Sequence, residues 1–196
     1  MRPIARIATL ATATLATATL ATAALLPLAT QAATLGGPDY ATQYDYREFY
    51  AATDNRNFLV VLEGNPYPGM DPSEMARRLL PVMQAAKPPP RLTFTYDKPL
   101  EPQRPDYRMY LVFDPALNLG GDAVCRGERR HRPQLQGRVY IFAVYCRNDQ
   151  AMSQVTGWTS APTPEDSDML SLFKIMFAQL YNYSDVLRPS HKPRIP

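Results

Sequence analysis

A stretch without any charge separates the first residues of this chain from the part that can fold into a globular domain. Arg2 and Arg6 are basic, whereas residues 7–31 contain no charged side chain. This stretch is rich in alanine, threonine and leucine, and the pentapeptide Thr-Leu-Ala-Thr-Ala occurs in it three times in tandem. A basic start followed by an apolar segment is typical of a secretory signal peptide.

Small residues end the apolar stretch and suit a signal peptidase. We predict a signal peptide over residues 1–33, cleaved after Ala32 or Ala33. An uncleaved membrane anchor is the alternative, because about 20 apolar residues can cross a bilayer, but the many threonines and the small-residue exit favour cleavage. No apolar run of that length follows, so we predict a periplasmic or secreted protein with no membrane span in the mature chain.

The charge of the remaining chain is nearly balanced. Removing Arg2 and Arg6 from the 21 basic residues leaves 19 basic against 18 acidic residues. Such a chain lacks the overall basic character that nucleic-acid binding favours, so we expect no nucleic-acid partner. Hydrophobic residues make up 45% of the chain and charged residues 20%, which is ordinary for a folded domain.

The predicted export decides how the two cysteines, Cys125 and Cys146, are interpreted. An even number of cysteines in an exported chain predicts a disulfide. A zinc site would need further ligands, and the only histidines are His131 and His191, in an arginine-rich loop and a proline-rich tail. The chain also has no Gly-x-Ser-x-Gly, His-Glu-x-x-His, Gly-x-Gly-x-x-Gly or Walker motif. We therefore predict a disulfide, no metal and no cofactor.

Hydrophobic periodicity predicts the secondary structure. Strand patterns occupy residues 58–63, 92–96, 107–113 and 139–146. Helix starts occur at Asp71-Pro72 and again at Thr163-Pro164, where an acidic or hydroxyl side chain precedes a proline. Shorter helices are predicted within residues 40–53 and from Asp149 to Val155. Pro81 should kink the first main helix or end it near Leu80.

The order of these elements, β-α-β-β-β-α, predicts an α+β fold. We expect a mostly antiparallel sheet of about four strands, packed by two main helices and joined by one disulfide. Residues 92–96 and 107–113 would form a long hairpin, and residues 139–146 a central strand. Residues 34–188 would form a single domain, followed by a Pro-rich basic tail over residues 189–196.

A basic loop follows the first cysteine. Four arginines lie in it, beside His131 and one glutamate: Arg126, Arg129, Arg130 and Arg132. Tethered by a disulfide, such a loop could bind phosphate, anionic lipid headgroups or acidic glycans through charge-assisted hydrogen bonds. The alternative is a solvated loop whose arginines serve solubility.

A second candidate site joins the strand at residues 58–63 to the helix that follows it. Its residues are Glu63, Asn65, Tyr67 and Asp71. A strand end facing a helix start can receive an anion, and Glu63 with Asp71 or Asp114 could act as a carboxylate pair. Alternatively, glycines and prolines shape a rigid turn and Asp71 caps the helix.

Tyrosines are concentrated near the start of the mature chain. They are Tyr40, Tyr44, Tyr46, Tyr50 and Tyr67. Tyrosine combines apolar area with a polar tip, so these residues either offer a platform for sugars or a partner protein, or are partly buried in the core.

Two segments resemble parts of an uncharacterised group of exported proteobacterial proteins. They are Phe58-Leu-Val-Val-Leu-Glu-Gly-Asn-Pro-Tyr-Pro-Gly69 and the spacing Cys146-x-x-Asp149-x-x-x-Ser153-x-x-x-Gly157. The resemblance spans roughly residues 47–183 and implies a Gram-negative periplasm; it assigns no activity and no functional residue.

Because no catalytic constellation is found, we predict an exported, disulfide-stapled protein that acts by binding rather than catalysis. Its ligand is unknown; an anionic ligand or an envelope protein would suit the arginine loop. A carboxylate-dependent periplasmic hydrolase and a structural component of envelope assembly are the alternatives.

Overall fold

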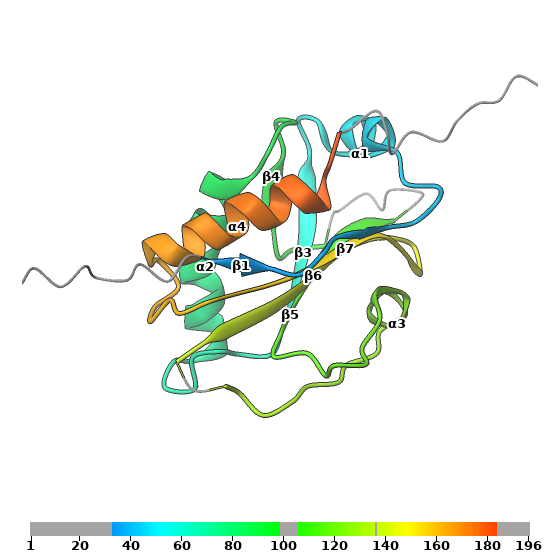
Figure 1. The fold of residues 1–196 in the computed structure, drawn as a ribbon. Coiled ribbons are helices and arrows are strands. Elements are labelled where there is room, and N and C mark those ends of the chain that lie inside the picture. Colours follow the sequence, from blue (N-terminus) through cyan, green and yellow to red (C-terminus); the bar gives the residue numbers. More distant parts are fainter. Residues whose placement is uncertain (1–32, 99–105, 136, 184–196) are drawn as a thin grey trace, which may run out of the picture. The chain divides into compact units, whose positions relative to one another are not determined.

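A mixed β-sheet forms the centre of the domain in the computed structural model, which describes residues 33–98, 106–135 and 137–183. In these residues seven strands form one sheet, in the order β1-β7-β6-β5-β3-β4, and β2 also pairs with β7 (Figure 1). The strands are β1 (Thr34–Leu35), β2 (Asp39–Tyr40), β3 (Asn57–Glu63), β4 (Thr93–Thr95), β5 (Tyr107–Phe113), β6 (Val139–Arg147) and β7 (Gln150–Thr159). Strand β3 is parallel to β4 and to β5, and the other pairs are antiparallel.

The prediction of an α+β fold is confirmed, but the mostly antiparallel four-stranded sheet is wrong. The predicted hairpin of residues 92–96 with 107–113 does not form, because β4 and β5 lie on opposite sides of β3. A helical crossover returns the chain in its original direction, which makes β4 parallel to β3. Strand β5 then takes the other edge of β3. Pairing on both sides buries most of the apolar run of β3.

The helix predicted from Asp149 to Val155 is also wrong, because this segment belongs to β7. Asn148 and Asp149 form a two-residue turn between β6 and β7, and Asn148 has a positive φ of 52°. Asn and Asp favour such turns as well as helix caps. Buried and partly exposed residues alternate through much of β7, as expected for a strand. The residues that suggested a helix cap, Asn148 and Asp149, therefore form a hairpin turn.

Aspartate side chains cap the three longer helices. Helices α1 (Tyr46–Thr53), α2 (Pro72–Ala86) and α4 (Ser167–Leu180) follow Asp45, Asp71 and Asp166. Each carboxylate accepts a hydrogen bond from a backbone N–H of the first turn, which stabilises the helix start. The predicted start of α2 at Asp71 is confirmed.

Of the two effects predicted for Pro81, a kink or an early end of the helix near Leu80, the early end does not occur. Helix α2 continues through Pro81 to Ala86. Pro81 lies on the exposed side of α2, where water can hydrate the carbonyl group that loses its helical hydrogen bond. The solvent-exposed position therefore lets the helix tolerate a proline.

The main core lies between one face of the sheet and helices α1, α2 and α4 (Figure 1). The buried residues of α4 are Met169, Leu172, Phe173, Met176, Phe177 and Leu180, as the apolar periodicity predicts. Helix α4 crosses β7 closely at Gly157, where an added Cβ would lie only 2.8 Å from Leu172 Cδ1. Tyr183, which lies beyond the end of α4, is exposed.

A smaller core lies on the opposite face, under the short helix α3 (Gly121–Cys125) and the loop after it. The predicted disulfide is present here and joins Cys125 of α3 to Cys146 of β6. Both cysteines are buried, so the bond fastens α3 directly to the centre of the sheet.

The described part of the chain falls within a single compact unit. It contains no helix that is both long enough and apolar enough to cross a membrane. The predicted signal segment up to residue 32 and the predicted tail at residues 189–196 lie outside the described residues.

Candidate functional site

The candidate site lies at the carboxyl ends of the adjacent parallel strands β3 and β5. From β3 the chain continues through α2 to β4 on one side, and from β5 it continues through α3 to β6 on the other. Where connections leave neighbouring parallel strands in opposite directions, they open a crevice that commonly binds ligands. The loops that begin after Glu63 and Phe113 therefore flank the candidate site.

The two sets of site residues predicted from the sequence meet at this edge. Arg129 of the arginine loop forms an ion pair with Glu63 at the end of β3, with Nε 2.6 Å from Oε1. The guanidinium also lies 4.6 Å from the centre of the Tyr110 ring. Its Nη1 donates to the carbonyl oxygen of Val124. Arg129 is thus committed to partners within the chain.

The other arginines of the loop differ in their surroundings. Arg130 donates to Asn118 Oδ1 at 3.1 Å and lies 3.3 Å from a carboxylate oxygen of Glu128. Arg132 lies over the Tyr140 ring at 4.3 Å. Arg126 is exposed at the end of α3. The carboxylates of Glu63 and Glu128 therefore balance the charges of Arg129 and Arg130, the two central arginines of the predicted anion-binding loop.

Asp114 follows β5 in an unusual environment. Its exposed fraction is 6% and its φ is 46°, a left-handed conformation that few non-glycine residues adopt. Within the described residues, Asp114 Oδ1 has no hydrogen-bond partner, and neither have Nε and Nη2 of Arg132. Burial raises the pKa of Asp114, while the positive charges of Arg132 and His131 oppose that rise. The site thus holds a buried carboxyl beside a guanidinium.

His131 packs across the start of the β3–α2 loop. Its Nδ1 lies 2.9 Å from the carbonyl oxygen of Phe113, and an added Cβ on Gly64 would lie 3.3 Å from its Cε1. Gly64 also has a positive φ of 86°. A glycine at this position thus allows the histidine ring to approach the backbone closely.

The remaining residues of the second candidate site shape its loop. Asn65 donates to the carbonyl oxygen of Met70 and accepts from the backbone N–H of Tyr67. Asp71 accepts from the backbone N–H of Ser73, and the hydrogen bonds from Ser73 lower the pKa of Asp71. Glu63 faces Arg129 while Asp71 caps α2, and neither lines any of the three cavities described below. The carboxylates named for the hydrolase alternative therefore do not line these three cavities.

A cleft of about 440 Å³ opens beside this edge, between three loops. It is lined by Pro66, Tyr67, Pro68, Gly69, Met70, Gln134, Gly137, Arg138, Val139, Ser160, Ala161 and Pro162. The first loop follows β3, the second precedes β6, and the third follows β7. Of the residues predicted from the sequence, only Tyr67 lines it.

Arg138, which lines this cleft, and Trp158 beside it were not among the site residues predicted from the sequence. The Arg138 guanidinium lies 4.5 Å from the centre of the Trp158 ring. No carboxylate of the described residues lies within 4 Å of it, in contrast to Arg129 and Arg130. Had the hairpin turn at Asn148 been recognised, Trp158 would have been placed on a strand beside the start of β6.

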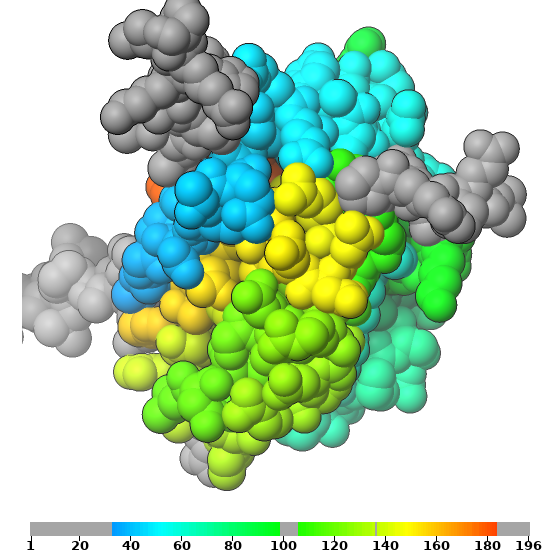
Figure 2. Space-filling view, turned by 90° about the vertical axis from the view of Figure 1, so that its right-hand side faces the viewer, coloured from blue at the N-terminus to red at the C-terminus, as the bar shows by residue number. Residues whose placement is uncertain are grey.

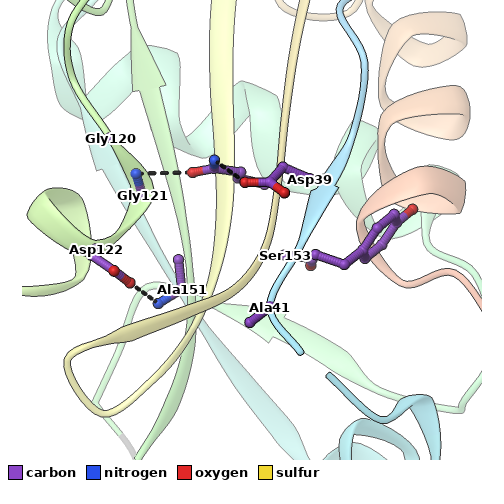
Figure 3. A pocket seen from close by; sticks show the side chains of 9 residues that line it. Asp39, Ala41, Gly120, Gly121, Asp122, Ala151 and Ser153 are labelled. Carbon is purple, nitrogen blue, oxygen red and sulfur yellow. Dashed lines mark hydrogen bonds between the residues drawn. The ribbon is translucent and has the colours of Figure 1, made fainter. Parts of the chain in front are cut away.

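A second cavity of about 330 Å³ lies between α3 and the strands at the other edge of the sheet (Figure 3). Its polar groups bond to one another. Gly121 N–H donates to Gln154 Oε1, Gln154 Nε2 donates to Asp39 Oδ2, and Ala151 N–H donates to Asp122 Oδ1. Figure 2 shows the N-terminal strands in blue, the β6–β7 hairpin in yellow and α3 in green side by side on this face. The hydrogen bonds from Gly121 to Gln154 and from Ala151 to Asp122 join α3 to β7.

A group of three or more His, Cys, Asp or Glu side chains suited to a metal ion does not occur among the described residues. The exposed carboxylates of the second cavity are part of its internal hydrogen bonds.

Comparisons with known proteins add one structural likeness. No family model matches the chain, and no curated protein matches it. Among solved structures, it is similar to the dodecamer of a PelC variant from Paraburkholderia phytofirmans, with 9% identity and a TM-score of 0.38. The match covers 76% of this chain and 97% of the other. A TM-score this low does not establish a shared fold.

Proposed function

We propose that the chain is an exported binding protein, periplasmic or secreted, which holds an organic anion in the cleft between the loops around Tyr67, Arg138 and Ala161. The charge-free N-terminal stretch and the disulfide both support export, because disulfides persist in oxidising compartments. The observation that carries the binding role is the Arg138 guanidinium, which lines the cleft without a described carboxylate partner.

Arg138 has the environment of a recognition group. The guanidinium lies over the Trp158 ring, and this contact with the ring leaves the N–H donors of Arg138 for a ligand. Arginine presents these donors in a planar fork that matches a carboxylate or a phosphate. The charge of Arg138 is available, whereas those of Arg129 and Arg130 are balanced within the chain.

The walls of the cleft indicate the polarity and the size of the rest of the ligand. They are largely apolar, with Tyr67, Met70, Val139, Ala161 and prolines around the opening. A volume near 440 Å³ suits a small molecule. The best match is therefore an amphipathic anion, in which an acidic group meets Arg138 and an apolar body enters the cleft.

Export predicts a processed and oxidised product. Expressed as the full chain in a Gram-negative host, the protein should be recovered outside the cytoplasm with its N-terminus at Ala33 or Thr34 and with no thiol available for alkylation. Intact-mass spectrometry of each cell fraction measures both properties. As a control, Leu15→Arg together with Leu20→Arg should block export by charging the apolar segment. An unprocessed cytosolic product with two free thiols would contradict the proposal.

Binding at the cleft can be measured with 8-anilinonaphthalene-1-sulfonate, an aromatic anion whose fluorescence rises in apolar sites. Replacing Arg138 by alanine should weaken its affinity about tenfold or more, because a hydrogen bond to a charged group contributes about 1.5–3 kcal/mol. Arg126→Ala is the matched control, since it removes an exposed arginine outside the cleft. Equal affinities for the two variants would exclude Arg138 as the recognition group.

A further inference from the structure

Three tyrosines surround a cavity on a different part of the molecule. Tyr46 and Tyr50 lie one turn apart on α1, and Tyr183 follows α4. The Tyr46 ring centre is 6.3 Å from that of Tyr50 and 6.0 Å from that of Tyr183. With Arg47 they line an open cavity of about 470 Å³. It shares no lining residue with the cleft at Arg138.

The core does not account for this arrangement. Helix α1 is held to the domain by Phe49 and Thr53, which are buried. By contrast, Tyr50 is 44% exposed and Tyr183 is 77% exposed. Apolar ring surface left in water does not stabilise the fold, and several such rings around one cavity indicate an interaction site.

The central ring is held in place. The Tyr46 hydroxyl donates a hydrogen bond to the carbonyl oxygen of Pro89 at 2.8 Å, and its ring also lies 5.9 Å from that of buried Phe49. The rings of Tyr50 and Tyr183 are inclined to it by 61° and 60°. The held Tyr46 ring and the two rings inclined to it thus present one aromatic surface.

The polar group at this cavity carries little net charge. Arg47 makes a two-point contact with Asp45, with Nη2 3.0 Å from Oδ2 and Nε 3.3 Å from Oδ1. Its positive charge is therefore balanced within the chain. Such a site favours a neutral ligand with hydroxyl groups over an anion.

From these observations we infer that Tyr46, Tyr50 and Tyr183 form a binding site for a neutral saccharide. A pyranose ring has apolar C–H faces, which pack on tyrosine rings, and hydroxyl groups at its edge, which bond to tyrosine hydroxyls. This site is independent of the anion cleft.

The test is a calorimetric titration of the mature chain with maltohexaose, cellohexaose and chitohexaose, which are neutral oligosaccharides of different linkage. At least one should bind. Tyr50→Ala and Tyr183→Ala should each lower the association constant about two- to tenfold, the usual range for an aromatic contact, and the double variant at least as much as the larger single effect. Tyr50→Phe, which keeps the ring, should retain most of the affinity.

Two controls separate this site from general effects. Leu117→Ala removes an exposed apolar side chain elsewhere, and Arg138→Ala removes the cation of the anion cleft; neither should change saccharide affinity. The variants at Tyr50 and Tyr183 should keep the wild-type thermal transition, because both residues are exposed. Failure of all three oligosaccharides to bind, or unchanged affinity in the double variant, would overturn the proposal. Binding of hexaproline in their place would overturn it in favour of a proline-rich peptide.

Discussion

Replacing Phe49 by alanine is expected to lower the free energy of unfolding by about 3–5 kcal/mol, the usual loss for a buried phenylalanine. Phe49 is fully buried at the centre of an aromatic cluster. Its ring stacks on that of Tyr181 at 4.0 Å and meets those of Phe58 and Tyr145 edge to face. Removing it leaves a cavity that these rings cannot fill without leaving their present contacts.

Denaturant unfolding followed by circular dichroism measures this loss, with Tyr50→Ala as the control. Tyr50 is the next residue on the same helix but is 44% exposed, so its replacement should change the free energy of unfolding by less than about 1 kcal/mol. Similar losses for the two variants would mean that α1 does not pack on the sheet as described.

Loss of the disulfide is expected to have the second large effect. Replacing Cys125 and Cys146 together by alanine should lower the free energy of unfolding by about 3 kcal/mol, because the bond restricts the unfolded chain. Both side chains are buried in the smaller core, so their removal also weakens the packing of α3 on β6. Equilibrium unfolding with and without reductant measures the effect.

The double alanine variant supplies its own control, since reductant should destabilise the wild-type chain and leave the variant unchanged. Hydrogen exchange should become faster in α3 and the loop after it, while α2 and α4 keep their protection, because these helices pack on the opposite face. Uniform loss of protection over the whole chain would contradict a local role for the bond.

Local signals predicted the parts of the fold that depend on neighbouring residues. The helix start at Asp71 and the buried face of α4 follow from capping and from a spacing of three and four residues. The signal-peptide prediction also rests on local composition, but it concerns residues outside the described range. The disulfide prediction succeeded because only two cysteines are present in a chain predicted to be exported.

Pairing over long distances could not be predicted in the same way. The parallel position of β4 and β5 on either side of β3 depends on which edge of that strand each segment reaches. At Asn148-Asp149 the same residue types suit a helix cap and a hairpin turn, and the partner strand β6 decides between them.

For the candidate sites, the sequence alone determined which reactive groups are present: arginines in one loop, carboxylates at strand ends and tyrosines between residues 40 and 67. The tertiary structure decided which of these groups are already paired. It places Glu63 against Arg129, leaves Arg138 over Trp158 without a described carboxylate partner, and brings Tyr183 to Tyr46 across the chain. The physical reason is that charge and side-chain type are properties of single residues, whereas neutralisation and exposure depend on contacts between residues far apart in the chain.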